Sequence, residues 1–154
     1  MITEKEFNAK NFNIIPSSPG KASYQVTEAE MKRFDSTKNL PYMIAKRKLK
    51  FEKEMNLKPT PAYDVLEDKC QISITSIKKT INGTNKVTRQ FLYKFAVGLH
   101  MTIEEANEFF KLCGGRLSEE NPGDYICMRA LEDGDDIYLF IQQFEEFTNL
   151  KIAR

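Results

Sequence analysis

Residues 73–83 read SITSIKKTING, and this stretch carries the local signals of one short helix. Ser73 is a favourable N-cap, because its hydroxyl can accept a hydrogen bond from a backbone N–H of the first turn. Ile77 and Ile81 are four residues apart and therefore share one face. Gly83 is a strong C-terminal stop. The pattern predicts a helix with an apolar stripe on one side and a polar, basic face on the other.

The polar face of this helix would present Thr75, Ser76, Lys78 and Lys79. All of these side chains can donate hydrogen bonds and two are cations, and such a surface suits phosphate groups and base edges. Lysine-rich faces are also common on ordinary solvated helices, so this face alone leaves both interpretations open. The rest of the chain separates them.

Composition points to a single globular unit with a tail. The chain has 154 residues, of which 41% are hydrophobic and 29% charged, values that exclude wholesale disorder and a membrane class. No apolar run approaches the roughly 18 residues of a membrane-spanning helix. The N-terminal sequence MITEKEFNAK also lacks the apolar core of a signal peptide. We therefore expect a cytoplasmic protein with no membrane partner.

Charge is divided unevenly along the chain, although the net charge is only +1. Residues 1–100 hold 18 Lys and Arg against 10 Asp and Glu, whereas residues 101–154 hold 5 against 12. The basic part contains the predicted helix at 73–82, which is the distribution expected of a nucleic-acid-binding face. The alternative is that the basic and acidic parts merely attract each other.

The cysteines and the single histidine give no support for a metal site. Cys70, Cys113 and Cys127 are odd in number and widely spaced in apolar helical contexts, so we expect reduced, buried thiols. His100 is the only histidine, and no Cys-x-x-Cys or His-x-x-x-His spacing occurs. We place His100 at the C-terminal end of a helix, where partial positive charge is favourable. No metal and no cofactor are expected.

Apolar residues at helical spacing, together with capping residues, predict further helices at 41–56, 62–70, 89–99, 103–113, 121–131 and 136–147. Pro41 stands at a favourable first-turn position, and Thr60 is the expected N-cap of the second of these helices. Thr88 is expected to cap the third, and Thr102 forms a capping box with Glu105 at the start of the fourth. Because no segment alternates like a strand, the sequence predicts an all-α fold.

The N-terminal part of the chain shows weaker signals. Residues 1–26 have no helical or strand period and include a Pro-, Ser- and Gly-rich cluster at 16–20, which predicts a flexible arm. Thr27–Asp35 opens with a capping box and is a candidate short helix. We divide the chain into an N-terminal arm with this short helix at 1–40, a helical domain at 41–116, and a C-terminal helical extension packed on it at 117–154.

With this order of helices, residues 42–112 resemble the helix-turn-helix domain of the Xre/Cro/phage-repressor-like family of bacteria and phages. The run VTRQFLYKFAVGLHMTIEE is similar to the family's fourth helix and the capped start of its fifth. The resemblance implies a five-helix, lambda-repressor-like fold. In that fold AYDVLEDKC is the second helix and SITSIKKTING is the third, which lies in the major groove of DNA. Residues 117–152 resemble an extension of two helices carried by a group of bacterial members.

The same resemblance assigns DNA contacts. Positions that face bases are Ile74, Thr75 and Lys79, and positions near phosphates are Thr60, Ser73, Asn82, Thr84, Asn85 and Lys86; Ser76 and Lys78 complete the predicted DNA-binding face. Two positions depart from the family pattern. Ile74 is apolar where many relatives have a polar base reader, and Thr80 stands where an aliphatic residue is usually buried. Ile74 would suit a thymine methyl group, or a protein contact.

The C-terminal helices carry Phe140, Ile141, Phe144 and Phe147 at helical spacing. This is more aromatic surface than a short extension needs for docking on the predicted helix at 103–113 alone, so we expect a homodimer contact through the C-terminal helices. The alternative is that every one of these side chains is buried within the monomer.

These features lead to a sequence-preferring transcription regulator that binds double-stranded DNA. The alternative is a protein-interaction module on a helix-turn-helix scaffold, such as a phage or mobile-element inhibitor, because a scaffold does not fix its use. An enzyme is not expected. The paired acids at 104–105, 119–120 and 135–136 are adjacent in sequence and would point to different sides of a helix.

Overall fold

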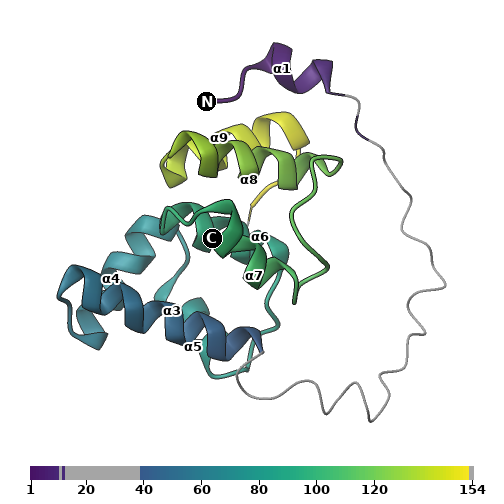
Figure 1. Ribbon diagram of the computed structural model, residues 1–154. Helices are drawn as coiled ribbons and strands as arrows, with labels where there is room; N and C mark the ends of the chain where they lie inside the picture. Colours follow the sequence, from purple (N-terminus) through teal and green to yellow (C-terminus); the bar gives the residue numbers. More distant parts are fainter. Residues whose placement is uncertain (11, 13–38, 153–154) are drawn as a thin grey trace, which may run out of the picture.

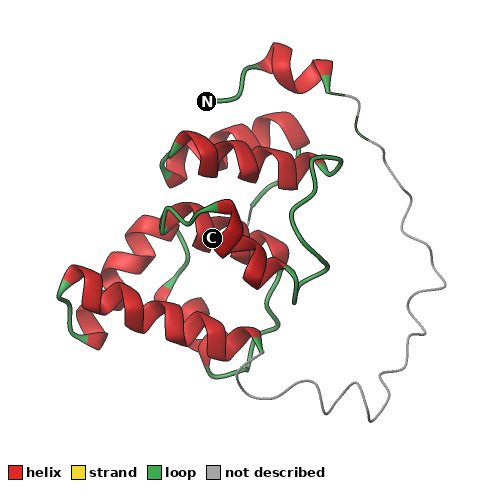
Figure 2. Cartoon of the chain, in the orientation of Figure 1, coloured by secondary structure: helices red, strands yellow, loops and turns green. Residues whose placement is uncertain are grey.

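The computed structural model describes residues 1–10, 12 and 39–152. This part of the chain is all-helical and contains no strand, which confirms the predicted fold class at this level (Figures 1 and 2). Its helices are α1 (Glu4–Ala9), α3 (Leu40–Met55), α4 (Pro59–Cys70), α5 (Ile74–Ile81), α6 (Arg89–Gly98), α7 (Ile103–Phe110), α8 (Pro122–Asp133) and α9 (Ile137–Thr148).

Helix α3 begins and ends as predicted to within a residue. The side chain of Asn39 caps it by accepting a hydrogen bond of 2.8 Å from the Tyr42 backbone N–H. Asn56 ends it in the left-handed conformation, at a φ of 52°. Asparagine is one of the few residues besides glycine that tolerates this conformation, which explains the sharp stop.

Helix α4 begins earlier than predicted. Its N-cap is Lys58, which makes no side-chain capping bond, and Thr60 lies inside the first turn, so the prediction of Thr60 as the N-cap is wrong. The reason is proline chemistry: Pro59 lacks a backbone N–H, and the first helical turn is the place where none is needed. The predicted core residues of α4 are all fully buried: Ala62, Leu66 and Cys70.

The caps of the later helices are confirmed. Thr88 accepts a hydrogen bond from the Phe91 N–H, and Thr102 accepts one from the Glu105 N–H, each of 3.1 Å. The predicted capping box of Thr102 with Glu105 forms only by half, because the Glu105 carboxylate accepts a hydrogen bond from Arg47 of α3 and not from the Thr102 backbone N–H. Helix α8 runs on to Asp133 and then stops at Gly134, so the turn predicted at 132–135 is shorter than expected.

The N-terminal residues are helical where the sequence showed no period. Helix α1 spans Glu4–Ala9, and Thr3 caps it, so the prediction of no helix in residues 1–26 is wrong for this segment. A helix of this length has too few turns to show a repeat, and packing rather than periodicity stabilises it. The candidate helix at 27–35 lies outside the described residues.

Helix α1 packs against the C-terminal helices α8 and α9 (Figure 1). Ile2 is 2% exposed, and its carbonyl accepts a hydrogen bond of 2.8 Å from the Gln143 side chain of α9. The Phe7 ring stacks on Phe147 with 4.9 Å between ring centroids. Glu6 forms an ion pair with Arg129 of α8.

The aromatic surface of α9 is consequently used within the chain. Phe140, Ile141 and Phe144 are buried, and Phe147 is half-buried with its ring stacked on Phe7. These side chains therefore do not supply the spare surface on which the expected dimer contact rested. A homodimer through the C-terminal helices stays a prediction.

Helices α4 and α6 approach each other closely at Gly98. A Cβ atom at this position would lie 2.5 Å from the Lys69 carbonyl oxygen and 2.6 Å from the Cys70 sulfur. No side chain fits there, so glycine is required for this crossing.

Cys70 is free and fully buried, and burial raises the pKa of its thiol to about 12. Cys127 is likewise free and buried, whereas Cys113 is only half-buried.

A buried carboxylate joins α6 to the C-terminal extension. Asp124 of α8 is 2% exposed and accepts hydrogen bonds from the Arg89 guanidinium, the nearest at 2.6 Å, and from the Tyr93 hydroxyl. It also accepts a bond of 3.1 Å from the Ser118 backbone N–H. Burial and the neighbouring carboxylate raise the pKa of Tyr93, which keeps its hydroxyl protonated and able to donate. Every lone pair of this carboxylate is in use, as a buried charge requires.

We predict that Asp124→Asn lowers the free energy of unfolding by about 2–3 kcal/mol, because it leaves the Arg89 guanidinium without its counter-charge. Urea denaturation followed by circular dichroism measures the change. Glu120→Gln removes one exposed carboxylate nearby and is the matched control, expected to change stability by less than about 0.5 kcal/mol. Equal effects of the two substitutions would contradict this role for Asp124.

Candidate nucleic-acid interface

Helices α4 and α5 are joined by a short turn that is held from behind by α6. Gln71 ends α4 in the left-handed conformation at a φ of 54°, and its backbone N–H bonds to the Glu67 carbonyl at 2.8 Å. Its own carbonyl accepts a hydrogen bond of 2.8 Å from the ammonium of Lys94, a residue of α6 that is only 3% exposed. Ile72, the next residue, is buried at 2% exposure. The turn is therefore fixed both by packing and by a buried charge.

The first turn of α5 is closed by its own serines. The Ser73 hydroxyl oxygen accepts a hydrogen bond of 3.1 Å from the Ser76 N–H and donates one of 2.9 Å to the Ser76 hydroxyl. The predicted N-cap is thus confirmed. Both hydroxyls are engaged within the helix, so in this arrangement their first role is to stabilise α5.

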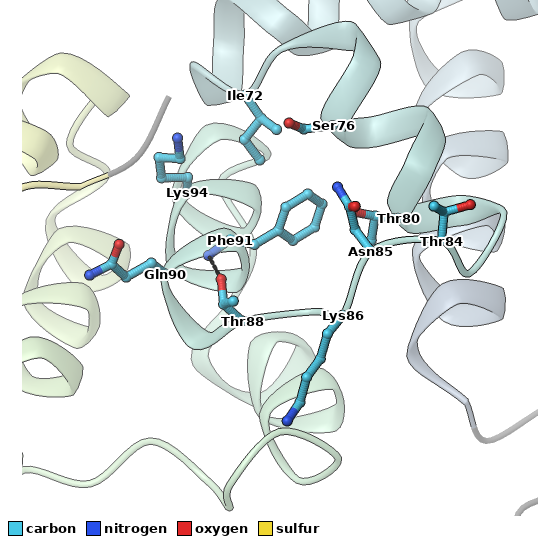
Figure 3. Close-up of a pocket in the computed structure, with 10 residues that line it drawn as sticks. All are labelled: Ile72, Ser76, Thr80, Thr84, Asn85, Lys86, Thr88, Gln90, Phe91 and Lys94. Carbon is cyan, nitrogen blue, oxygen red and sulfur yellow. Dashed lines mark hydrogen bonds between the residues drawn. The ribbon is translucent and has the colours of Figure 1, made fainter.

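The inner face of α5 contains one residue that the apolar stripe did not predict. Ile77 is 1% exposed as expected, but Thr80 is also buried, at 2%, while Ile81 is only partly buried. Thr80 therefore occupies an inner position despite its hydroxyl. Figure 3 shows it at the edge of a groove, beside Asn85.

The outer face of α5 is exposed at Thr75, Lys78 and Lys79. The Lys78 ammonium lies 5.1 Å from the centre of the Tyr63 ring of α4, and the buried Lys48 of α3 lies 4.0 Å from the same ring. A cation over an aromatic face is attracted by the ring quadrupole. This contact orients Lys78 toward the start of α4, the helix on which Thr60 is exposed.

The loop after α5 continues the exposed polar surface. Its backbone folds back on the helix, since the Thr84 and Asn85 N–H groups both bond to the Lys79 carbonyl, at 2.8 and 3.1 Å. The Asn82 side chain accepts a further bond of 2.9 Å from Thr84 N–H. Gly83, at a φ of 83°, supplies the left-handed turn. The predicted phosphate-contact residues Asn82, Thr84, Asn85 and Lys86 are all exposed in this loop.

A groove of about 370 Å³ runs between α5, this loop and the start of α6 (Figure 3). The Phe91 ring lies in the middle of the groove, and the Lys86 side chain points out of it. Gln90 and Phe91 line the groove and were missed by the sequence analysis. Their position directly after the Thr88 cap was the available signal, since it places them in the first turn of α6.

An acidic rim borders the other end of α5. It consists of Asp64, Glu67 and Asp68, which are exposed on α4 beside the turn. The Glu67 carboxylate accepts a hydrogen bond of 2.8 Å from the Ile74 N–H, the first residue of α5. A carboxylate at a helix N-terminus is stabilising, but it occupies a donor that an anionic ligand would use. The exposed cations of α5 and its following loop lie toward the other end of this helix; they are Lys78, Lys79 and Lys86.

The structure brings most of the predicted DNA-binding residues onto one continuous surface. The predicted contact residues between 73 and 79 lie on α5 or at its N-cap, and those between 82 and 86 lie in the adjoining loop. Thr60 lies on a different helix, α4. Within the described ranges no group of three or more His, Cys, Asp and Glu side chains is placed to hold a metal ion. In the same part of the chain, no helix has the length and apolar character needed to cross a bilayer.

We predict that Ser73→Ala lowers the free energy of unfolding by about 1 kcal/mol, because it removes the N-cap of α5. Thermal and urea denaturation measure the loss. Thr75→Ala, an exposed change on the same helix that touches no cap, is the control and should cost about 0.5 kcal/mol or less. An unchanged free energy of unfolding for Ser73→Ala would contradict the capping role of this hydroxyl.

Comparisons with models of known protein families, with curated protein sequences and with solved structures yield no significant match to this chain.

Proposed function

We propose that this protein binds double-stranded DNA through α5 and acts as a sequence-preferring regulator of transcription. The observation that carries the proposal is the continuous exposed surface of α5 and its following loop, in which hydrogen-bond donors and three lysines are held on a rigid support. Protein–DNA interfaces draw most of their affinity from cations placed near phosphates and their sequence choice from side chains at base edges.

We infer that α3 to α7 form a helix-turn-helix unit in which α4 and α5 are the DNA-binding pair. Two details support this arrangement: Cys70 gives a small, fully buried residue directly before the turn, and Ile72 is buried within it. The Lys94 bond to the Gln71 carbonyl supports the same turn from α6. In this proposal α5 enters the major groove, and α8 and α9 extend the unit on the side away from DNA.

Affinity is assigned to Lys78, Lys79 and Lys86, which are exposed and lie on α5 and its loop. We expect the triple change of these lysines to alanine to weaken binding and to flatten the slope of log affinity against log salt concentration by about two to three units, since each phosphate contact contributes about 0.9. Fluorescence anisotropy with labelled duplex DNA at several salt concentrations measures the slope.

The control for this experiment removes the same charge elsewhere. Lys5, Lys111 and Lys151 are exposed and lie outside the proposed interface. Their triple change to alanine should leave the slope within about one unit of the original, the contribution of one phosphate contact. If both triple variants behave alike, binding follows net charge and the α5 surface is not the interface.

Sequence choice is assigned to Ile74 and Thr75 at the start of α5. Replacing Ile74 with alanine removes the apolar contact expected with a thymine methyl group and should relax selection at one base position by about 1–3 kcal/mol. Selection of binding sites from a random DNA library measures this. Leu49→Ala, an exposed apolar change on α3, is the control. An unchanged selected motif for Ile74→Ala would exclude Ile74 as a base reader.

A second candidate function is a protein-interaction module on the same scaffold. The acidic rim at the N-terminal end of α5 favours it, because Glu67 places a negative charge beside Ile74, where phosphates would otherwise approach. Ile74 would then be part of an apolar protein contact. The salt dependence of duplex binding separates the two functions, since phosphate neutralisation gives a steep slope. A flat slope with wild-type protein would favour the protein partner.

A further inference from the structure

A groove on the opposite side of α3 from the α4 contact has chemistry that the proposed function does not use. It lies between α3 and α7, is open to solvent, and has a volume of about 390 Å³. Tyr42 and Met43 of α3 and Phe109 of α7 provide apolar and aromatic lining. This volume falls within the range of sites that hold small molecules.

The lining of this groove includes a buried guanidinium that is not fully bonded. Arg47 is 8% exposed, and its Nε donates a hydrogen bond of 2.6 Å to the Glu105 carboxylate. Its Nη1 atom is buried and has no hydrogen-bond partner in the part of the chain that the structure describes. Buried donors are rarely left unpaired, and an unpaired charged donor is especially unfavourable. The guanidinium therefore keeps hydrogen-bonding capacity beyond its bond to Glu105.

The charge around the groove favours an anionic acceptor. Lys46 and Lys50 line it from α3, and both are exposed. On the α7 side, Glu105 is already paired with Arg47, and Glu108 with Lys111 at 3.0 Å. On the α3 side, Lys50 lies 3.8 Å from the Glu54 carboxylate. Lys46 is thus the lining lysine that forms no ion pair within the described residues.

We propose that this groove binds a small carboxylic acid with an aromatic or aliphatic body. The carboxylate would accept hydrogen bonds from Arg47 and attract Lys46 and Lys50, and the body would lie against Tyr42 and Phe109. A planar guanidinium is well suited to a carboxylate, because its donors form a fixed fork. The proposal is independent of DNA binding, since none of these residues belongs to the α5 surface.

Benzoate is the probe, because it joins a carboxylate to an aromatic ring of a size that fits the groove. Titration of ¹⁵N-labelled protein with benzoate should shift the Arg47 Nε–H signal and the backbone signals of Met43 and Phe109. Benzamide has the same shape without the charge, and its affinity should be lower than that of benzoate by a factor of about ten or more. Acetate lacks the ring and should also bind about tenfold more weakly. These comparisons use the unmodified protein, so folding of a variant does not affect them.

Variants locate the site. Lys50→Ala, on the edge of the groove, should weaken benzoate binding, whereas Lys53→Ala, exposed on the same helix outside the groove, should not. Arg47→Gln should abolish it, with folding checked by circular dichroism. The proposal is overturned if benzoate shifts no groove signal, if benzamide binds as well as benzoate, or if Lys50→Ala and Lys53→Ala bind equally.

Discussion

Helix α6 is enclosed by other helices, and this burial is the constraint on which the rest of the structure depends. Residues 92–98 are all buried, and α6 contacts α4, α7, α8 and α9. A polar group inside such a helix must find its partner in the chain. Lys94 accordingly reaches the turn before α5, and Tyr93 reaches Asp124 of α8. The same helix thus fixes the position of α5 on one side and the C-terminal extension on the other.

The two charged regions of the surface are produced by neighbouring helices rather than by separate parts of the chain. The sequence shows a basic region before residue 100 and an acidic region after it, yet the acidic rim beside α5 comes from α4, within the basic region. Position on a helix face, not average charge of a segment, decides what an approaching partner meets. The local contrast between α4 and α5 is the feature that distinguishes the two candidate functions.

Local sequence signals allowed most of the helices to be predicted. The features that were missed depend on contacts between residues far apart in the sequence. Ser73, Thr88 and Thr102 cap their helices as expected, because capping is a property of a few adjacent residues. Helix α1 was missed because its stability comes from Ile2 and Phe7 packing on helices far along the chain. For the candidate site, the exposure of the α5 lysines was predictable from helical spacing. The Arg47 groove was not, because α3 and α7 meet only in the folded chain.

The packing of α1 on α9 also bears on how the protein forms during synthesis. Ile2 bonds to Gln143 and Phe7 stacks on Phe147, so residues that leave the ribosome before α3 to α8 find their partners in α9, which leaves it after those helices. Until α9 has emerged, Ile2 and Phe7 lack the α9 side chains against which they pack. Contacts between residues so distant in sequence form late and slowly. The helices from α3 to α7 lie closer together along the chain, and their mutual contacts can form while the extension is still being translated.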